Sequence, residues 1–359
     1  MAARFDPARF VRSPWARPLI PVSWIYGRVA LARRNRFEAN AVALPVPVVS
    51  VGNVTTGGTG KTPTVELLVR ELLARGRRPA ILSRGYRAAR GELSDEAQLL
   101  ALNLPDVPHH VGADRVLTGR AAVDRGADVL VLDDGFQHAR LKRDLDIVLF
   151  DALDPFGGGR VLPAGLLREP LEVLSRAGLV CITRGQLVPR EDVEILRGIL
   201  RDRCPDAPHV ELATDAQGWE PLPCPPGVQS CAPESFSGKR ALVFAGIGNP
   251  SAFFLTLRAM GLEIAETVRF PDHHPYTSAD LASIGARARA LGVAVVATTQ
   301  KDAVKLGGHL DPAGPPWFYL RIACRVGAGE ALWRRALDQL LCRHKSSPSP
   351  GSRCEGEGA

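Results

Sequence analysis

The stretch PVPVVSVGNVTTGGTGKTPTVELLVREL, residues 45–72, decides the fold of this chain. A valine-rich apolar run leads into a turn that contains Gly57, Gly58 and Gly60, and a helical pattern of apolar residues follows. A phosphate-binding loop requires this order of strand, glycine-rich turn and helix, because the glycines let successive backbone N–H groups face an anion. The stretch therefore predicts binding of a nucleoside triphosphate.

Two side chains stand directly after the turn, where phosphate chemistry needs them. Lys61 would reach the β- and γ-phosphates, and the hydroxyl of Thr62 would ligate Mg²⁺. The strict pattern has glycine at position 55, where this chain has Thr55. The flanking strand and helix still favour a phosphate loop over a structural glycine turn. The expected loop comprises Thr55, Thr56, Gly57, Gly58, Thr59, Gly60, Lys61 and Thr62.

Short apolar strands alternate with helical patterns along the rest of the chain. Residues 78–83, 128–133, 146–151 and 178–183 are continuous apolar runs, which are typical of a parallel sheet covered on both faces. A second alternation begins at residue 240. We expect an α/β fold, a P-loop NTPase-type doubly wound parallel sheet with a second, smaller α/β C-terminal domain. The expected boundaries are a surface segment at 1–40, the P-loop domain at 41–214, a linker at 215–239, the C-terminal domain at 240–343 and a disordered tail at 344–359.

The composition indicates a globular protein, but it does not determine the function of the protein. The 359 residues are 45% hydrophobic and 23% charged, as in a globular protein with a sizeable core. Seven cysteines are scattered without a CxxC pair, which supports neither a disulfide framework nor a zinc site. The net charge of +7 is compatible with nucleic acid, an anionic membrane or a phosphorylated substrate. The sequence contains no recognition motif that would support a nucleic-acid-dependent ATPase, so we expect no nucleic-acid partner.

The first forty residues are basic and aromatic. Residues 18–32 are apolar, but they contain Pro21 and Arg28 and are too few to span a bilayer. Arginines flank this run, and Trp15 and Trp24 are residue types that favour a membrane interface. The pattern predicts a helix that lies on an anionic membrane surface. The alternative is a basic helix packed on the domain with its charges solvated.

Polar residues that could carry chemistry follow two of the expected strands. The run VLVLDD ends in Asp133 and Asp134, where phosphate-loop enzymes place a carboxylate beside Mg²⁺; the alternative is an ordinary helix cap. Gln137 and His138 come next and should lie at the carboxyl edge of the sheet, where ligands bind in such folds. Arg84 follows another strand and should lie near the phosphates.

Acid and base candidates occur in two further segments. Asp95 and Glu96 come after Ser94, and their plain interpretation is a capped, electrostatically favoured helix start. His273 and His274 lie in a proline-bounded loop that suits proton transfer or metal binding. Arg168 lies in the glycine- and proline-rich stretch 154–170, which could grip a phosphate or a glycan, or be a surface loop.

Together these motifs resemble the family of tetraacyldisaccharide 4'-kinases, the lipid A 4'-kinases of Gram-negative bacteria. From about residue 14 to residue 306 the matching landmarks are VGNVTTGGTGKTP, LSRGY, SDEAQLLA, VGADR, LDDGFQH, DPFGGGRVLPAGLLREP, GIGNPSAFF, FPDHHPY and TQKDAVKL. The resemblance implies transfer of the ATP γ-phosphate to the 4'-hydroxyl of the lipid A disaccharide 1-phosphate precursor. It also implies a peripheral enzyme on the cytoplasmic face of the inner membrane, in contact with anionic lipids.

The same resemblance assigns roles to individual residues. It implies that Asp95 and His273 form a base dyad, with His274 as the neighbouring alternative, and that Asp133 and Asp134 hold Mg²⁺. Gln300 departs from the family, which commonly has glutamate before KDA. The remaining alternative from a different class is a P-loop ATPase that acts as a partner-binding switch. DDGFQH, DHH and the N-terminal segment favour the lipid kinase.

Overall fold

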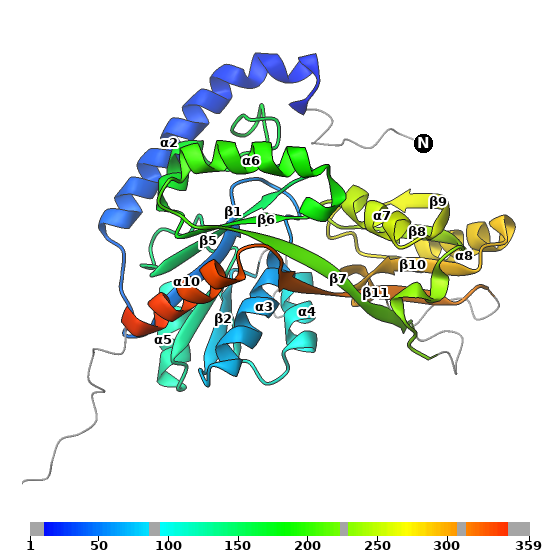
Figure 1. Ribbon diagram of the computed structural model, residues 1–359. Helices are drawn as coiled ribbons and strands as arrows, with labels where there is room; N and C mark the ends of the chain where they lie inside the picture. The colour runs from blue at the N-terminus through cyan, green and yellow to red at the C-terminus, as the bar shows by residue number, and fades with distance from the viewer. Residues whose placement is uncertain (1–10, 86–93, 223–228, 307–313, 344–359) are drawn as a thin grey trace, which may run out of the picture.

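In the part of the chain that the structure describes, one continuous sheet has eleven strands, in the order β3-β2-β4-β1-β5-β6-β7-β11-β10-β8-β9 (Figure 1). The computed structural model describes residues 11–85, 94–222, 229–306 and 314–343. The strands are parallel except at the junction of β7 and β11, which are antiparallel. The expected fold, a doubly wound sheet with a smaller α/β unit at the C-terminal side, is confirmed. The expected tail at 344–359 lies outside the described residues.

The first half of the sheet has helices on both faces. Its strands are β1 (Val48–Asn53), β2 (Pro79–Ser83), β3 (His109–Val111), β4 (Val129–Asp133), β5 (Leu145–Asp151) and β6 (Leu179–Thr183). Helices α3 (Lys61–Ala74) and α4 (Asp95–Asn103) pack on one face, and α5 (Arg115–Asp124) and α6 (Arg190–Arg203) on the other. β1, β2, β4, β5 and β6 are buried along their whole length, which explains why their sequences are mostly apolar.

The second unit repeats the layered plan on a smaller scale. Its strands are β8 (Arg240–Ala245), β9 (Glu263–Arg269), β10 (Val295–Thr299) and β11 (Trp317–Val326). Helix α7 (Pro250–Ala259) packs on one face and α8 (Ser278–Leu291) on the other. A short helix α9 (Gln300–Ala303) follows β10 and contacts α4 of the first half.

The connection between the halves corrects the sequence-based boundaries. Residues 215–221 belong to strand β7 (His209–Pro221) rather than to a linker, and β7 pairs with β11 from Pro221 opposite Phe318 to Leu212 opposite Val326. The linker prediction was wrong there because the mixed polar sequence of this strand gives no apolar run. Residues 233–236 form a 3₁₀ turn, and residues 223–228 lie outside the described residues.

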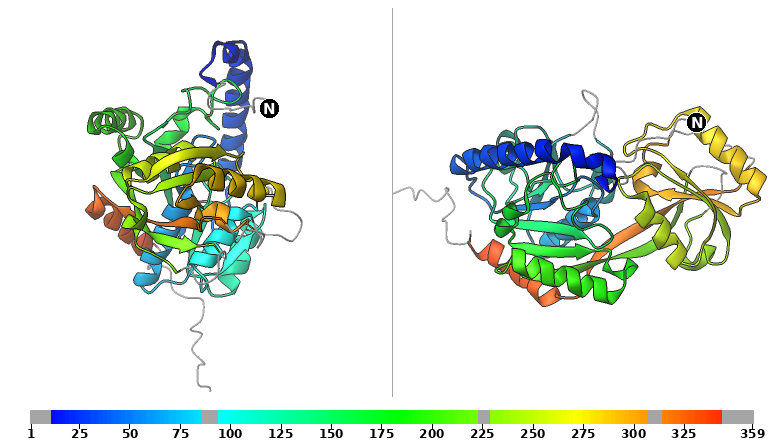
Figure 2. Two further views of the ribbon diagram at one scale, coloured as in Figure 1. Left: turned by 90° about the vertical axis from the view of Figure 1, so that its right-hand side faces the viewer. Right: turned by 90° about the horizontal axis from the view of Figure 1, so that it is seen from above.

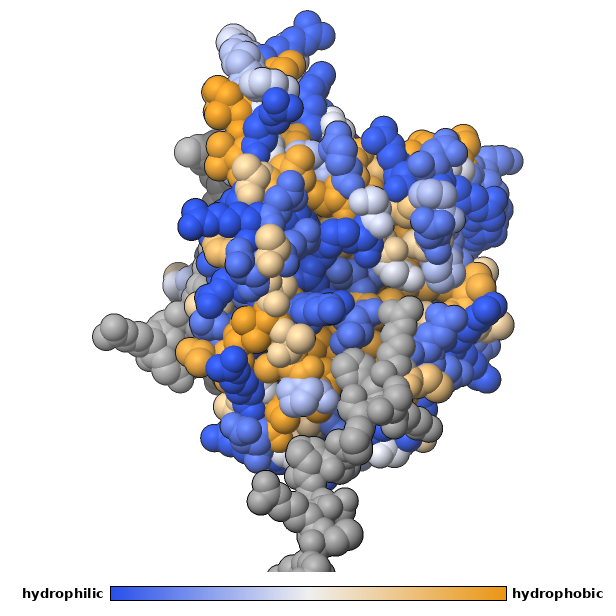
Figure 3. All heavy atoms as spheres, turned by 90° about the vertical axis from the view of Figure 1, so that its left-hand side faces the viewer, coloured by the Kyte–Doolittle hydropathy of each residue, from blue (hydrophilic) through white to orange (hydrophobic). Residues whose placement is uncertain are grey.

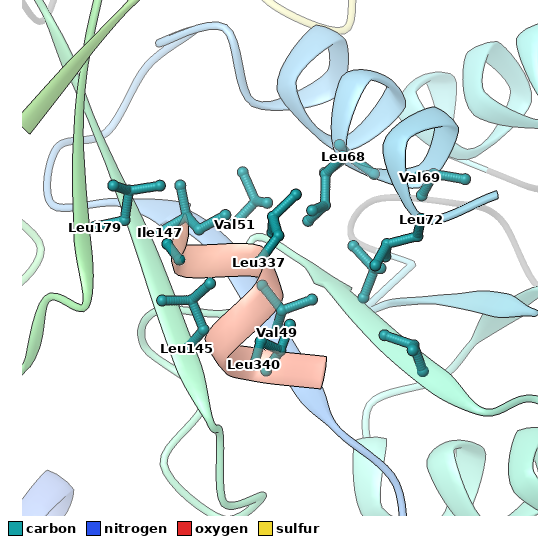
Figure 4. Packing of buried hydrophobic residues seen from close by; sticks show 14 of the residues in the cluster. Val49, Val51, Leu68, Val69, Leu72, Leu145, Ile147, Leu179, Leu337 and Leu340 are labelled. Atoms are coloured by element: carbon teal, nitrogen blue, oxygen red, sulfur yellow. The ribbon is translucent and has the colours of Figure 1, made fainter. Parts of the chain in front are cut away.

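The last helix, α10 (Glu330–Arg343), packs in the first half, although the expected C-terminal domain included residues up to 343. Figure 4 shows Leu337 and Leu340 of α10 against Val49, Ile147 and Leu68 of the phosphate-loop half. Trp333 of the same helix is fully buried in this core. A domain boundary drawn from the order of elements in the chain could not show which core this helix would join.

Two N-terminal elements lie along one side of the first half (Figure 2), a 3₁₀ helix η1 (Pro14–Leu19) and helix α2 (Ile20–Ala39). Within α2 only Ser23, Gly27 and Arg34 are buried. Its outer surface exposes large apolar side chains, among them Trp24 (64%), Ile25 (58%) and Val29 (61%). Within the described residues, no helix combines the length and the apolar character that crossing a bilayer demands.

Candidate active site

The phosphate loop connects β1 to the N-terminus of α3, as expected. Gly57 and Gly60 have φ angles of 138° and 88°, which side chains rarely tolerate. Thr55 does not have a positive φ, and its carbonyl and hydroxyl accept hydrogen bonds from Asn53 Nδ2 at 2.8 and 3.2 Å. Thr55 therefore fits the loop without a positive φ, although the strict pattern has glycine at this position. Thr56 donates its N–H to the Leu166 carbonyl at 2.8 Å.

Lys61 lies beside the acid pair that ends β4. Its Nζ is 3.1 Å from Asn53 Oδ1 and 3.6 Å from Asp134 Oδ1. Arg168 NH1 donates to both carboxylate oxygens of Asp134, at 3.0 and 2.8 Å. Burial opposes ionisation of Asp134, but the charges of Lys61 and Arg168 hold its pKa well below the ordinary range. Asp134 is therefore a carboxylate at neutral pH.

Asp133 has the opposite electrostatic environment. Burial, together with the neighbouring charge of Asp134, raises its pKa to about 6. The two adjacent side chains therefore carry one negative charge between them more readily than two, because closely spaced carboxylates repel each other. A cation between them would favour the doubly ionised state.

A buried arginine holds the backbone of this acid pair. Arg115, at the start of α5, donates to the carbonyls of Asp133 and Asp134 at 2.7 and 3.1 Å. Asp134 has a φ of 52°, in the left-handed region that residues other than glycine seldom adopt. Such strain persists only where the surroundings fix the backbone, and it clusters at functional sites. Arg115 was quoted within the VGADR landmark but received no role from the sequence.

The other residues expected at this edge of the sheet lie around the acid pair. Gln137 donates to the Asn53 carbonyl at 2.8 Å and lies 3.3 Å from Arg168 NH1. Burial and nearby arginines lower the pKa of His138 to about 4, so its ring is neutral at pH 7. Both residues, and the exposed Arg84, line the same cavity as Lys61.

The acid of α4 meets a histidine from the second unit. His273 Nδ1 lies 3.1 Å from Asp95 Oδ2, although 178 residues separate them. His273 has a φ of 61°, which again marks a locally strained residue at this site. Burial raises the pKa of Asp95, but the hydrogen bond from His273 and the charge of Lys305 lower it below the ordinary value overall. Ser94 also caps α4, so the plain interpretation of this segment is correct as well.

His274 points to a different part of the molecule from His273. Its Nε2 lies 3.0 Å from Asp280 Oδ2 in the capping box of α8, and its ring stacks on Phe270. The structure thus brings His273, and not His274, to Asp95.

The TQKDAVKL segment connects the second unit to α4. Lys301 Nζ lies 2.6 Å from Glu96 Oε1 and 3.3 Å from Asp272 Oδ1, and its charge lowers the pKa of Glu96 against the effect of burial. Lys305 Nζ lies 3.4 Å from Asp95 Oδ2. Gln300, which departs from the family pattern, donates to Asn103 Oδ1 at 2.9 Å. It therefore contributes to the contact between the second unit and α4 through a neutral hydrogen bond.

A loop of the second unit also touches the phosphate loop. The side chain of Asn249 caps α7 and donates to Asp151 Oδ2 at 3.0 Å. Arg184 donates to the carbonyl of Gly58 at 2.7 Å. Gly248 approaches so closely that a Cβ atom there would lie 2.6 Å from the backbone nitrogen of Gly58. Two segments far apart in sequence therefore meet at the phosphate-binding turn.

One cavity of about 1270 Å³ joins these parts. Gly60, Lys61 and Asp134 line it on one side, His273 on another, and Tyr26 and Phe37 of α2 on a third. The cavity therefore contains the phosphate loop and His273 together, and it extends to the side of α2 that carries Tyr26 and Phe37.

The donor set suits Mg²⁺ bound together with a nucleotide. Within the described residues no cluster of three or more His, Cys, Asp or Glu side chains could hold an ion alone. Mg²⁺ in phosphate-transfer sites commonly takes one or two carboxylates and completes its shell with phosphate oxygens and water. Asp133, Asp134 and the hydroxyl of Thr62 are hard oxygen donors of that kind. The buried Thr59 hydroxyl also has no hydrogen-bond partner among the residues that the structure describes.

Comparison with known proteins finds one family along nearly the whole chain. The family model described as tetraacyldisaccharide-1-P 4'-kinase matches residues 15–342. A tetraacyldisaccharide 4'-kinase of Syntrophus aciditrophicus is 40% identical over 93% of this chain and 96% of its own length. One from Anaeromyxobacter dehalogenans is 43% identical over 74% and 73%. The crystal structure of LpxK from Aquifex aeolicus in complex with ATP has a TM-score of 0.68 and 27% identity, over 91% of this chain and 99% of that one.

Proposed function

We infer that this chain, which belongs to the tetraacyldisaccharide-1-P 4'-kinase family, transfers the γ-phosphate of ATP to the 4'-hydroxyl of a tetraacyldisaccharide 1-phosphate in lipid A biosynthesis. The observation in this structure that best supports this function is that Lys61 and His273 line the same cavity. A donor end and a proton-accepting end in one cavity are what phosphoryl transfer to an alcohol requires.

In the proposed reaction the Asp95–His273 pair takes the proton of the 4'-hydroxyl. The hydroxyl oxygen attacks the γ-phosphorus, the bond from that phosphorus to the β–γ bridging oxygen breaks, and ADP leaves. Lys61 and the N–H groups of the phosphate loop stabilise the charge on the phosphates. The distance of 3.1 Å between His273 Nδ1 and Asp95 Oδ2 supports this role, because general acid–base groups act within hydrogen-bond reach.

We propose that Thr62, Asp133 and Asp134 hold Mg²⁺. The ion would neutralise charge on the transferring phosphate. Arg168 NH1 binds both carboxylate oxygens of Asp134 and also donates to Gln137 Oε1, which supports a role for Arg168 in placing the carboxylate rather than in binding the lipid. Glu96 and Lys301 would hold the His273 loop against α4.

The acceptor has acyl chains in a bilayer, so we further propose that η1 and α2 lie on the membrane surface at its cytoplasmic face. The exposed Trp15, Trp24, Ile25 and Val29 support this location, and Arg28 stacks over the Trp24 ring at 5.0 Å. Figure 3 shows apolar and hydrophilic side chains side by side on the face that carries the N-terminal helix, as an interfacial surface requires. Arginine on this face would attract anionic lipids.

The reaction is tested with purified protein, ATP, Mg²⁺ and detergent-dispersed disaccharide 1-phosphate, with the lipid products separated by chromatography. A product with one additional phosphate supports the kinase. Partner-stimulated ATP hydrolysis without any phosphorylated lipid would favour the switch ATPase instead.

Membrane association is tested separately by flotation with vesicles that contain anionic phospholipid. Replacing Trp24 and Ile25 by serine should weaken binding, because each exposed apolar side chain stabilises the bound state by roughly 1–3 kcal/mol. Leu117→Ser is the matched control, since Leu117 on α5 is equally exposed (63%) and does not belong to η1 or α2. Equal binding of all variants would contradict the interfacial location.

A further inference from the structure

Helix α2 docks on the first half of the molecule through few buried residues. Ser23 Oγ accepts the N–H of Ala164 at 2.8 Å, and a Cβ atom on Gly27 would lie 3.3 Å from Pro170. Both contacts are to the glycine- and proline-rich stretch 154–170. The third buried residue, Arg34, carries a charge, and its side chain is only 2% exposed. A buried charge is costly unless it is paired and hydrogen-bonded, so the partners of Arg34 define its role.

Arg34 uses its guanidinium to join three parts of the chain. It pairs with Glu38 Oε1 at 3.0 Å within α2, and it forms a salt bridge with Glu169. Its NH2 donates to the carbonyl of Phe136 at 2.9 Å, and its guanidinium lies over the Phe136 ring at 5.0 Å from the ring centre. A planar fork of donors can serve such partners together, whereas the single ammonium of lysine cannot.

Two partners of Arg34 lie close in sequence to residues of the acid-pair site. Phe136 follows Asp134 by two positions and is fully buried. Glu169 follows Arg168, the arginine that binds both oxygens of Asp134. The strained turn is thus held by two buried arginines that come from two different helices. Arg115 of α5 takes the carbonyls of Asp133 and Asp134, and Arg34 of α2 takes that of Phe136.

We propose that Arg34 is a positioning residue that links the seating of helix α2 to the placement of Asp134 and Arg168 at the phosphate site. It touches neither phosphate nor lipid itself. The inference rests on the proposed function, in which α2 lies on the membrane and Asp134 holds the metal. It adds that the membrane helix and the metal-binding turn form one rigid unit, so that displacement of the helix loosens the turn.

The test compares Arg34→Lys with Arg36→Lys, a matched control on the exposed side of the same helix. The first measurement is the affinity of each purified variant for a non-hydrolysable ATP analogue with Mn²⁺, without lipid. Partners that orient metal ligands commonly matter by 10–100-fold, so Arg34→Lys should weaken this binding by about 10-fold or more. The second measurement is hydrogen exchange of the amides of residues 135–138, which should lose protection in Arg34→Lys alone.

The outcomes separate this inference from the proposed reaction. Unchanged Mn²⁺–nucleotide affinity and unchanged exchange at residues 135–138 in Arg34→Lys would overturn the inference even if the kinase assay succeeds. Weakened binding with faster exchange supports it even if no lipid product forms. If Arg34→Lys does not fold, Glu169→Gln serves in its place, because it keeps the side-chain volume and removes the charge that anchors the guanidinium. Wild-type affinity in Glu169→Gln would then count against the inference.

Discussion

Replacing Asp95 by asparagine should stop turnover while leaving ATP binding nearly intact. The two side chains of the Asp95–His273 pair are each less than 20% exposed and lie 3.1 Å apart. Asparagine keeps the volume and a hydrogen-bond partner, but it removes the negative charge that takes or directs the proton in the proposed mechanism. General acid–base groups contribute about 10²–10⁴-fold, so the barrier should rise by about 3–5 kcal/mol.

The measurement is kcat at saturating ATP and lipid, together with the dissociation constant of an ATP analogue. We expect kcat to fall by at least about 100-fold in Asp95→Asn. The analogue should bind within a few-fold of wild type, because the phosphate loop and Lys61 are untouched. His273→Gln should show a similar loss, whereas His274→Gln should show a much smaller one, since His274 bonds to Asp280 instead.

A double variant decides whether the two residues act as a unit. If they do, Asp95→Asn combined with His273→Gln loses little more than either single change, because groups that act together are strongly non-additive. Losses that multiply would refute the dyad. A collapse of ATP-analogue binding in Asp95→Asn would also refute it, and would make Asp95 a nucleotide ligand.

Two further substitutions test the electrostatics and the packing of the site. Burial raises the pKa of Asp133 from 3.8 to about 6, so the free energy of unfolding falls as pH rises through that window and remains lower above it. Asp133→Asn removes a penalty of about 3 kcal/mol and should raise the Tm of nucleotide-free enzyme more at pH 7.5 than at pH 5, while turnover is lost; an equal shift at both pH values would contradict this. Gly248→Ala should lower nucleotide affinity about tenfold or more, because its Cβ would lie 2.6 Å from the backbone nitrogen of Gly58. Gly198→Ala on α6, where the Cβ meets open space, is the matched control and should leave affinity unchanged.

Local patterns in the sequence predicted the elements that are buried by their own composition. The runs around β1, β4, β5 and β6 are mostly apolar because both faces of the sheet are covered. The glycines of the phosphate loop signalled its turn equally well. The outer half of β7 was not predicted as a strand, because it is stabilised by pairing with β11, which starts nearly a hundred residues later in the chain.

The candidate site was predictable only in part, for a related reason. Asp133 and Asp134 could be placed because they end a recognisable strand. The pairing of Asp95 with His273 followed from family resemblance alone, since no spacing rule relates residues 178 positions apart. Arg34 stands in the run ARRNR, where every arginine has the same local surroundings. Its burial depends on Glu169 and Phe136, and therefore on the tertiary fold.

The antiparallel pair of β7 and β11 makes the second unit an insertion into the first. The chain leaves the phosphate-loop half along β7 and returns to it along the neighbouring β11, so the ends of the insertion meet where Pro221 lies opposite Phe318. The first half then still lacks α10, whose Trp333 and Leu337 complete its core. During synthesis the nucleotide-binding half therefore cannot finish folding until nearly the entire chain, including the unit that supplies His273, has left the ribosome.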